Sequence, residues 1–459
     1  MNLELNNNEP IAINHSRRPK KVFGLSGIVN IGNTTCYMNS AIQVLSWNYL
    51  LTNYLFGNKK EIYDILIKNA RKIFMDHVAF KTETSSSRIP MLLRLKIQNP
   101  HYDSTMLDSL ETTIVLNNTI TVQLIKLLEI MWAKNNIVIP SSFRKVFCEA
   151  RDNFFHGHEQ HDAEEAYSCI MEMMQKELGE EKNIQFKTSR ESVHDFLVFK
   201  NDIDCRLKAT DNEFERREII DVYNRKKREM PDESLTVNAF SEMKKYYGAS
   251  YSKITEMFTG FLYSSTNCPD SACGYISHKF DPFLHLSFPM QTNNTWFIET
   301  TNTALTIRDC MIEYFKTEIL DEKNLWKCEG CGNNVKAIKK SQLWTTPSVL
   351  VIQLKRFGIL AEKKDSRLVT FPLKNFDIGS FLSPIQKSTS KCTSYKLHCV
   401  INHIGGLHGG HYYSFCLNED TDKWYIFNDT KVTEIATEKI ISKAAYLLFY
   451  IRDDIHNRA

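Results

Sequence analysis

The chain has 459 residues, which is long enough for a sizeable core and for two or three domains or subdomains. Hydrophobic residues make up 42% and charged residues 24%, a composition that excludes a disordered or fibrous protein. The net charge of +3 is too small to predict nucleic acid or a membrane as the main partner, and we expect neither.

The first 22 residues predict a mobile tail, because they are rich in asparagine and lack the layout of a signal peptide. No apolar run reaches the length of a membrane span. Twelve cysteines without a secretory signal favour reduced thiols and metal ligands over disulfides, so we expect an intracellular, cytoplasmic or nuclear protein that is not secreted. Two basic runs, 17–21 and 225–228, are read as solvated surface, with localisation signals or anionic docking patches as the alternative.

A cysteine stands where a turn passes into a helix. Turn-favouring residues in 27–33 lead into a helical pattern from Tyr37, with Ile42, Leu45 and Tyr49 on one face. The unpaired N–H groups at a helix start favour an anion, so a thiolate at Cys36 would be stabilised there and could act as a nucleophile. A buried, inert cysteine at this position is the alternative.

Three later stretches, 62–77, 122–132 and 163–178, repeat apolar residues at three- and four-residue spacing and predict a mainly helical lobe. Residues 82–118 show no clear pattern and are assigned as a variable connection. Asp162 precedes the third helix and can act as its N-cap, with Glu165 completing a capping box. Charged residues dominate 181–250, where Pro231 interrupts them, and predict a helical, exposed insertion.

From Ile254 the composition changes to aromatic and β-branched residues with period-two stretches. Similar stretches follow at 343–357, 394–404, 411–418, 423–429 and 445–452. Strands that follow a helical lobe indicate an α+β protein with an antiparallel sheet rather than alternating βαβ units.

Two close cysteine pairs lie in this second half, each at a turn that carries Gly, Pro or Asp. Cys268 and Cys273 are separated by four residues, and Cys328 and Cys331 form a C-x-x-C motif. Four thiolates suit a tetrahedral Zn²⁺ and leave no position for water, so the zinc would be structural. Four free thiols, or a relict site without metal, are the alternative.

A glycine-rich segment near the C-terminus supplies a candidate base. Gly409 and Gly410 precede His411 and permit a substrate backbone to approach closely. His403 and His408 lie nearby, and the three histidines could instead hold a metal, although no zincin helix or carboxylate spacing accompanies them.

Asn428 and Asp429 follow in a later strand. Because side chains alternate along a strand, only one of the two should face His411. A cysteine with His and Asn or Asp far away in sequence is the arrangement of a cysteine hydrolase, in which base and orienting residue need only be near in space.

Together these segments resemble the ubiquitin-specific proteases, a family of papain-like cysteine peptidases that remove ubiquitin from proteins. The resemblance rests on NIGNTTCYMNS around the cysteine, QHDAEEA, the paired cysteines, GGHYYSF and KWYIFND, and it runs from 24 to 452. It implies an α+β fold with a helical thumb, an antiparallel β palm and zinc-bearing β fingers. The catalytic domain would be 23–452, comprising thumb (23–180), insertion (181–250), fingers (251–345) and palm (346–452), with a tail at 453–459.

The resemblance also implies roles for single residues. Cys36 would be the nucleophile, His411 the base and Asn428 the residue that orients the imidazole. Asn30, and Asn33 second, would donate to the oxyanion, although the chain has one threonine more than the family's usual N-x-G-N-T-C. The residues that would contact the basic C-terminal tail of ubiquitin are Asp162, Gly410, Tyr412 and Phe357, of which Phe357 could equally be a core residue.

The function implied is hydrolysis after the terminal glycine of ubiquitin by a monomer with one structural zinc. Ubiquitin and ubiquitinated proteins would be the partners. An inactive ubiquitin-binding scaffold is one alternative, favoured by the extra threonine, and a peptidase for another ubiquitin-like modifier is the other. Covalent reaction of Cys36 with a ubiquitin probe that carries a C-terminal electrophile would separate them.

Overall fold

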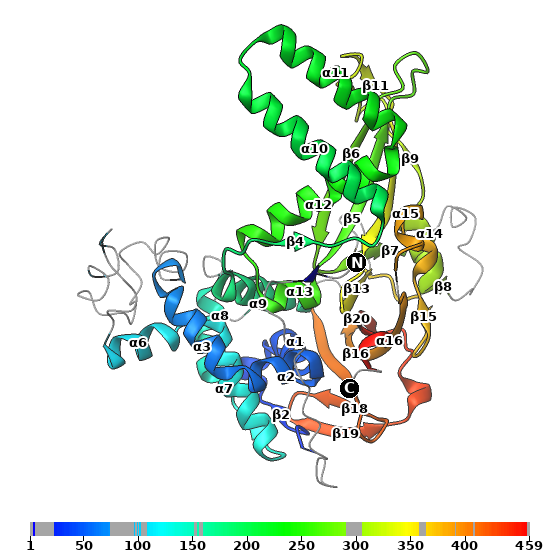
Figure 1. Ribbon diagram of the computed structural model, residues 1–459. Coiled ribbons are helices and arrows are strands. Elements are labelled where there is room, and N and C mark those ends of the chain that lie inside the picture. The colour runs from blue at the N-terminus through cyan, green and yellow to red at the C-terminus, as the bar shows by residue number, and fades with distance from the viewer. Residues whose placement is uncertain are drawn as a thin grey trace.

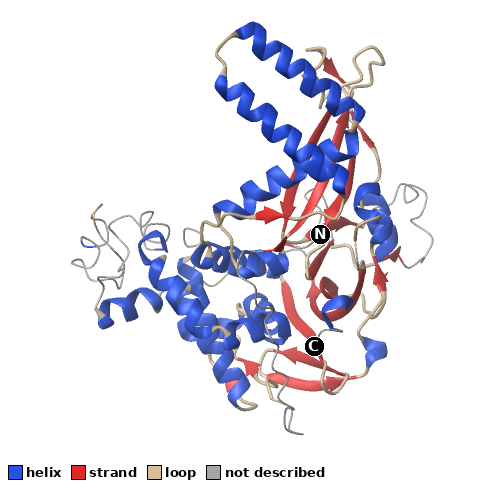
Figure 2. Cartoon of the chain, in the orientation of Figure 1, coloured by secondary structure: helices blue, strands red, loops and turns tan. Residues whose placement is uncertain are grey.

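The computed structural model describes residues 3–4, 23–73, 96, 99, 101, 108–150, 154–155, 159–290, 305–357, 364–390, 392–406 and 409–456. Figure 1 shows a helical lobe beside a β-rich part, from which a narrower extension of strands and helices projects. Helices dominate the first half of the chain and strands the second, and the two kinds of element lie largely in separate parts of the molecule (Figure 2), which confirms the α+β class. Of the helices described, none alone has the length and apolar composition of a membrane span, although α6 (Ser109–Leu116) and α7 (Ile120–Ala133), which meet at 82°, meet that criterion as a pair.

The helical lobe surrounds α1 (Cys36–Trp47), in which every residue is buried. This differs from the one-sided helix that the apolar pattern predicts. The helix also ends sooner than predicted, because Asn48 caps a new helix by accepting a hydrogen bond from Leu51 N at 3.1 Å, and Tyr49 therefore belongs to α2. Besides α6 and α7, the lobe contains α2 (Tyr49–Gly57), α3 (Lys59–Lys68), α8 (Ser141–Glu149) and α9 (Ala163–Leu178).

Two of the three predicted helices of the lobe are confirmed, by α7 and α9. The helix predicted over 62–77 is interrupted at Asn69, whose side chain donates to the carbonyl oxygens of Glu177 and Gly179 at 3.0 and 3.1 Å. Helical backbone resumes over 70–73, and 74–77 lie outside the described residues. Within the stretch 82–118, α6 begins with a capping box between Asp108 and Glu111.

The charged insertion is mainly helical, as predicted, and contains α10 (Glu191–Ala209), α11 (Glu213–Glu229) and α12 (Pro231–Ala249) after a short strand, β4 (Gln185–Phe186). Pro231 starts α12, since the first residue of a helix needs no N–H partner. A small core of Val193, Phe196, Val237 and Phe240 joins α10 to α12. Figure 1 shows α10 and α11 projecting beside the strands of the extension.

The β-rich part is an eight-stranded sheet that forms the palm. Along the sheet the strand order is β19, β18, β17, β16, β20, β13 and β7, and β15 pairs with β16. The strands are β7 (Leu286–Pro289), β13 (Val349–Lys355), β15 (Phe376–Asp377), β16 (Ser394–Gly405), β17 (Gly410–Asn418), β18 (Lys423–Asn428), β19 (Lys431–Ile435) and β20 (Ala445–Arg452). All neighbours are antiparallel except β7 and β13, which are parallel. The predicted antiparallel palm therefore needs one correction, at its β7 edge.

The extension is a second, four-stranded sheet that corresponds to the fingers. Its order is β6 (Ile276–Phe283), β5 (Gly260–Asn267), β12 (Ile338–Thr345) and β9 (Glu318–Ile319). A short hairpin of β10 (Trp326–Lys327) and β11 (Asn334–Val335) accompanies it. Because β7 belongs to the palm, the fingers are not the single stretch 251–345 that the sequence suggests.

The remaining described elements are short. After β7 come β8 (Leu305–Thr306) and α14 (Ile307–Tyr314), and the stretch expected as a C-terminal tail begins with α16 (Asp453–His456). The central packing of the molecule places α1 against β16, β17 and β18. This contact brings the first and last thirds of the chain together.

Candidate active site

Cys36 is the first residue of α1 and is 1% exposed. The turn before it is a 3-10 helix, Ile31–Asn33, in which Gly32 and Asn33 adopt positive φ angles of 64° and 57°. Thr35 occupies the N-cap position, but its hydroxyl accepts from Ile31 N at 2.9 Å and makes no capping bond to α1. The first-turn N–H groups of α1 are therefore not capped by Thr35 and remain oriented toward the helix start, beside the sulfur.

His411 lies near the start of β17, opposite Ile404 of β16. Asn428, the last residue of β18, places its side-chain Oδ1 2.6 Å from His411 Nε2. A carboxamide oxygen only accepts, so Nε2 carries the proton and Nδ1 remains for the sulfur of Cys36. The Cys36 side chain is the largest influence that raises the pKa of His411, to about 9, and Asn428 acts in the same direction against the effect of burial.

Asp429 also approaches the imidazole, with Oδ2 3.9 Å from His411 Nε2. The prediction that only one of Asn428 and Asp429 would face His411 is wrong. Asp429 lies beyond the end of β18 with a positive φ of 49°, so strand alternation does not apply to it. Its carboxylate accepts from Asn30 Nδ2 and Asn39 Nδ2, both at 3.0 Å, and so connects the histidine to the segment that carries the cysteine.

Asn30, the predicted oxyanion donor, is engaged at both ends of its amide. Its Oδ1 accepts from Thr35 N at 2.8 Å and from the Thr35 hydroxyl at 3.3 Å, while its Nδ2 donates to Asp429. Asn30 therefore fixes the loop before Cys36 by binding Thr35, in the loop that is one threonine longer than the family's usual motif. Asn33, the second predicted donor, is exposed.

Asp162 is the N-cap of α9, as predicted, and accepts from Glu164 N at 2.7 Å. The predicted capping box with Glu165 is absent from the bonds described for this helix end, because the cap reaches the second N–H rather than the third. The other carboxylate oxygen accepts from the Tyr446 hydroxyl at 2.7 Å. Burial raises the pKa of Asp162 to about 6, while these two hydrogen bonds lower it.

The two lobes meet directly at Gly410, whose N–H donates to Gln160 Oε1 at 3.1 Å. A Cβ atom at Gly410 would lie 2.2 Å from His403 Nε2 and 2.4 Å from Ile404 O, so the position has no room for a side chain. The glycine is therefore required by close packing beside His411.

Tyr412 and Phe357 both pack against the ring of His403. Tyr412 is 7% exposed, and its ring centroid is 4.5 Å from that of His403. Phe357 is half-buried and packs against His403 and Tyr446 at 5.2 and 5.5 Å. Burial is the largest cause that lowers the pKa of His403, to about 4, so this histidine is a neutral core residue. His408, the third histidine of the alternative metal site, lies outside the described residues.

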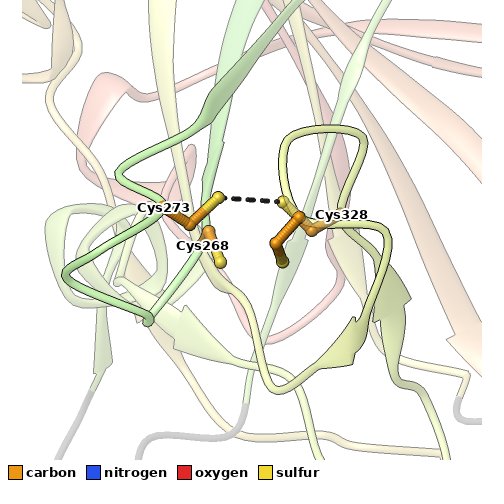
Figure 3. A group of neighbouring side chains, drawn as sticks. Cys268, Cys273 and Cys328 are labelled. Atoms are coloured by element: carbon orange, nitrogen blue, oxygen red, sulfur yellow. Dashed lines mark hydrogen bonds between the residues drawn. The ribbon is translucent and has the colours of Figure 1, made fainter.

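The four cysteines of the two predicted pairs meet at the tip of the fingers, and their Sγ atoms all lie within 4.8 Å of one another. Cys268 and Cys273 follow β5 and precede β6, and they face Cys328 from the loop between β10 and β11 (Figure 3). The Cys273 and Cys328 sulfurs are 3.7 Å apart. Zinc–sulfur bonds of about 2.3 Å in a tetrahedron require sulfurs about 3.8 Å apart, so these residues fit a metal ion.

Sequence comparison relates the chain to one family over most of its length. The family described as ubiquitin carboxyl-terminal hydrolase matches residues 26–450. The probable ubiquitin carboxyl-terminal hydrolase R319 of Acanthamoeba polyphaga mimivirus is 50% identical over 436 residues, which cover 95% of this chain and 92% of the relative. Human ubiquitin carboxyl-terminal hydrolase 2 is 27% identical over 435 residues, which cover 94% of this chain and 56% of the relative.

Solved structures share the fold at lower identity. A chain of the yeast SAGA deubiquitinating module superposes with a TM-score of 0.54 at 20% identity, covering 94% of this chain and 68% of that one. A chain of the SAGA module Ubp8/Sgf11/Sus1/Sgf73 bound to monoubiquitin gives 0.52 at 21% identity, with 94% and 69% covered. These similarities support the thumb, palm and fingers arrangement.

Proposed function

The chain belongs to the ubiquitin carboxyl-terminal hydrolase family of cysteine-type deubiquitinases, and we propose that Cys36, His411 and Asn428 carry out the hydrolysis. The observation that supports this most directly is the arrangement of Cys36, His411 and Asn428 at the start of α1. The Cys36 side chain is the largest influence that raises the pKa of the His411 imidazole, and Asn428 Oδ1 lies 2.6 Å from its Nε2. Nucleophile, base and orienting group are therefore in the order that thiol catalysis requires.

In the first half of the reaction, His411 Nδ1 takes the proton of the Cys36 thiol, and the sulfur attacks the carbonyl carbon of the terminal glycine. The C–N bond then breaks while the imidazolium protonates the departing amine. The product bound to the enzyme is a thioester between Cys36 and the ubiquitin carboxyl group.

In the second half, His411 takes a proton from water, and the resulting hydroxide attacks the thioester carbon. The C–S bond breaks, ubiquitin leaves as a carboxylic acid that loses its proton to water, and the Cys36 thiolate again pairs with the imidazolium. Asn428 and Asp429 stabilise the charged imidazole in both halves.

We assign the oxyanion to the first-turn N–H groups of α1 rather than to Asn30. The Thr35 side chain does not cap these groups, and preorganised N–H donors at a helix start stabilise developing negative charge. Asn30 is instead the residue that fixes the loop, because both ends of its amide are already bonded.

Of the residues proposed to bind the ubiquitin tail, Asp162 and Gly410 would contact it directly, whereas Tyr412 and Phe357 would act indirectly. Asp162 offers a carboxylate at the thumb side, where an arginine could donate to it. Gly410 keeps the backbone beside His411 bare. Tyr412 and Phe357 are proposed to position His403, and with it the strand that carries His411, through their ring contacts.

We propose that the metal of the fingers is Zn²⁺, held by Cys268, Cys273, Cys328 and Cys331. Four thiolates fill a tetrahedral zinc, which would supply a cross-link between the two finger hairpins and no reaction step. This cross-link joins elements that bury little apolar surface on their own.

Turnover of ubiquitin bearing a C-terminal fluorophore tests the proposal. The wild type should release the fluorophore, and Cys36→Ala should release none. Cys310→Ala, which removes another fully buried thiol away from α1, is the matched control and should retain activity. Binding of ubiquitin without turnover would support the scaffold alternative, and faster turnover of another modifier's substrate would support the third.

A further inference from the structure

A chain of hydrogen bonds crosses the palm and ends on Asp162 of the thumb. Ser287 Oγ of β7 donates to Gln353 Oε1 of β13 at 2.5 Å, and Gln353 Nε2 donates to the Tyr446 hydroxyl of β20 at 2.7 Å. The Tyr446 hydroxyl donates to Asp162 Oδ2 at 2.7 Å. Three neighbouring strands thus contribute one polar side chain each to a single carboxylate.

The direction of this chain is fixed by what each group can donate. Tyr446 has one hydroxyl proton, and its oxygen already accepts from the Gln353 amide, so the proton is directed to Asp162. Tyr446 is 1% exposed, so water does not compete for its hydroxyl group. The Asp162 carboxylate is therefore held in one orientation by a preorganised donor.

The other groups around Asp162 are mostly acidic or neutral. Glu164 and Glu165 lie on the same helix and oppose its ionisation, and the Tyr412 hydroxyl of β17 interacts with it from the palm. His285, just before β7, is 3.4 Å from Glu164 and is held neutral because burial lowers its pKa. Against burial and these neighbours, the Tyr446 hydroxyl is the largest influence that lowers the pKa of Asp162.

We propose that Tyr446 is a positioning residue that keeps the Asp162 carboxylate oriented and ionised, so that it can bind a basic residue in the tail of the substrate. The inference rests on the proposed function, since it concerns the same cleft. It assigns to the palm an influence on substrate affinity that does not pass through Cys36 or His411.

The test is a comparison of wild type and Tyr446→Phe for kcat/KM with the fluorogenic ubiquitin substrate, between pH 6 and pH 8.5. Losing one hydrogen bond to a carboxylate raises its pKa by about one pH unit. With the pKa of Asp162 at about 6, the ionised fraction at pH 6 would fall from about one half to about one tenth. We expect kcat/KM of the variant to be about fivefold lower at pH 6, mainly through KM, and within about 1.5-fold of wild type at pH 8.5.

Two controls separate this role from a general effect on packing. Tyr450→Phe removes a buried hydroxyl from the same strand that donates to Pro372 O at 3.0 Å, and its ratio to wild type should not vary with pH. In an Asp162→Asn background, Tyr446→Phe should have no pH-dependent effect. The rate at which iodoacetamide alkylates Cys36 should be the same in wild type and Tyr446→Phe.

A pH-independent loss in Tyr446→Phe, or no loss at any pH, would overturn the inference while leaving the catalytic assignment intact. A pH-dependent loss that persists in the Asp162→Asn background would overturn it as well. Wild type that does not turn over ubiquitin would instead refute the proposed function, and the inference with it.

Discussion

Replacing Asn428 with alanine should separate the contribution of the orienting carboxamide from that of the neighbouring carboxylate. Asn428 Oδ1 is 2.6 Å from His411 Nε2, whereas Asp429 Oδ2 is 3.9 Å from the same atom. A hydrogen bond to a charged group contributes about 1.5–3 kcal/mol. Because the Asp429 carboxylate still stabilises the His411 imidazolium in the variant, we expect a loss at the lower end of this range. The variant should lose about tenfold in kcat/KM.

Removing the Asn428 carboxamide should also change the pH dependence of kcat/KM. The Cys36 thiol and Asn428 raise the pKa of His411 to about 9, so the imidazolium form of His411 is present below that pH and is lost as pH rises through it. Without Asn428 the pKa of His411 should fall by about one pH unit, since 1.36 kcal/mol corresponds to one unit. The alkaline limb of kcat/KM should therefore move from about pH 9 to about pH 8.

The assay is turnover of the fluorogenic ubiquitin substrate from pH 6 to pH 10 by wild type, Asn428→Ala and Asn428→Asp. The aspartate variant keeps an acceptor and adds charge, so its alkaline limb should lie at or above that of wild type. Asn418→Ala removes a buried asparagine from the far end of β17, where it accepts from Thr421 N, and serves as the matched control. An Asn428→Ala enzyme within twofold of wild type, with its alkaline limb unmoved, would refute the reasoning.

Three further predictions concern burial, packing and metal. Glu177 is fully buried and accepts from Ile120 N and Thr121 N, and burial raises its pKa to about 7, so its protonated form stabilises the fold below pH 4.5 and this contribution is lost as pH rises to 7. In urea titrations, the free energy of unfolding of wild type minus that of Glu177→Gln should therefore fall by about 2–3 kcal/mol between pH 4.5 and pH 7. A difference that stays constant over this range would contradict the prediction. Gly410→Ala should reduce kcat/KM at least about tenfold without loss of far-ultraviolet circular dichroism, because its Cβ would lie 2.2 Å from His403 Nε2, and full activity would show that the strand has room. The protein should contain about one zinc per chain by elemental analysis, lost when Cys328 and Cys331 become serine, and a folded wild type without metal would exclude the zinc site.

Local patterns in the sequence suffice for the elements whose determinants are close in the chain. α7 and α9 follow from apolar spacing, and the N-cap Asp162 from its position before α9. The four cysteines could be grouped because two tight pairs at turns suit one tetrahedral ion. The pairing of His411 with Asn428 depended on the family resemblance, since neither strand reveals its neighbour in the sheet.

The complete burial of α1 could not be predicted, because its polar residues suggest a solvent-facing side. Gln43 donates to Ser26 O at 2.7 Å, and Ser46 accepts from Trp132 Nε1 at 2.9 Å. These partners are 17 and 86 residues away, and only the folded chain brings them to the helix. A polar residue in a helical pattern therefore does not by itself indicate exposure.

The role of Asp429 was missed for a related reason. Alternation holds only within a strand, and β18 ends at Asn428, so the turn that follows determines where the next side chain lies. The positive φ of Asp429 is a property of that turn. The sequence signal was the adjacency of two residues, Asn428 and Asp429, that can both accept from an imidazole.

The central claim is that the Cys36 sulfur and the His411 imidazole act together on the carboxyl end of ubiquitin. The most direct measurement is intact-mass analysis, with peptide mapping, of the protein after reaction with a ubiquitin probe that carries a C-terminal electrophile. We expect one adduct on Cys36 in wild type, none in Cys36→Ala, and formation slowed at least about a hundredfold in His411→Ala. An adduct on a different cysteine of the wild type, or an undiminished rate in His411→Ala, would contradict the claim.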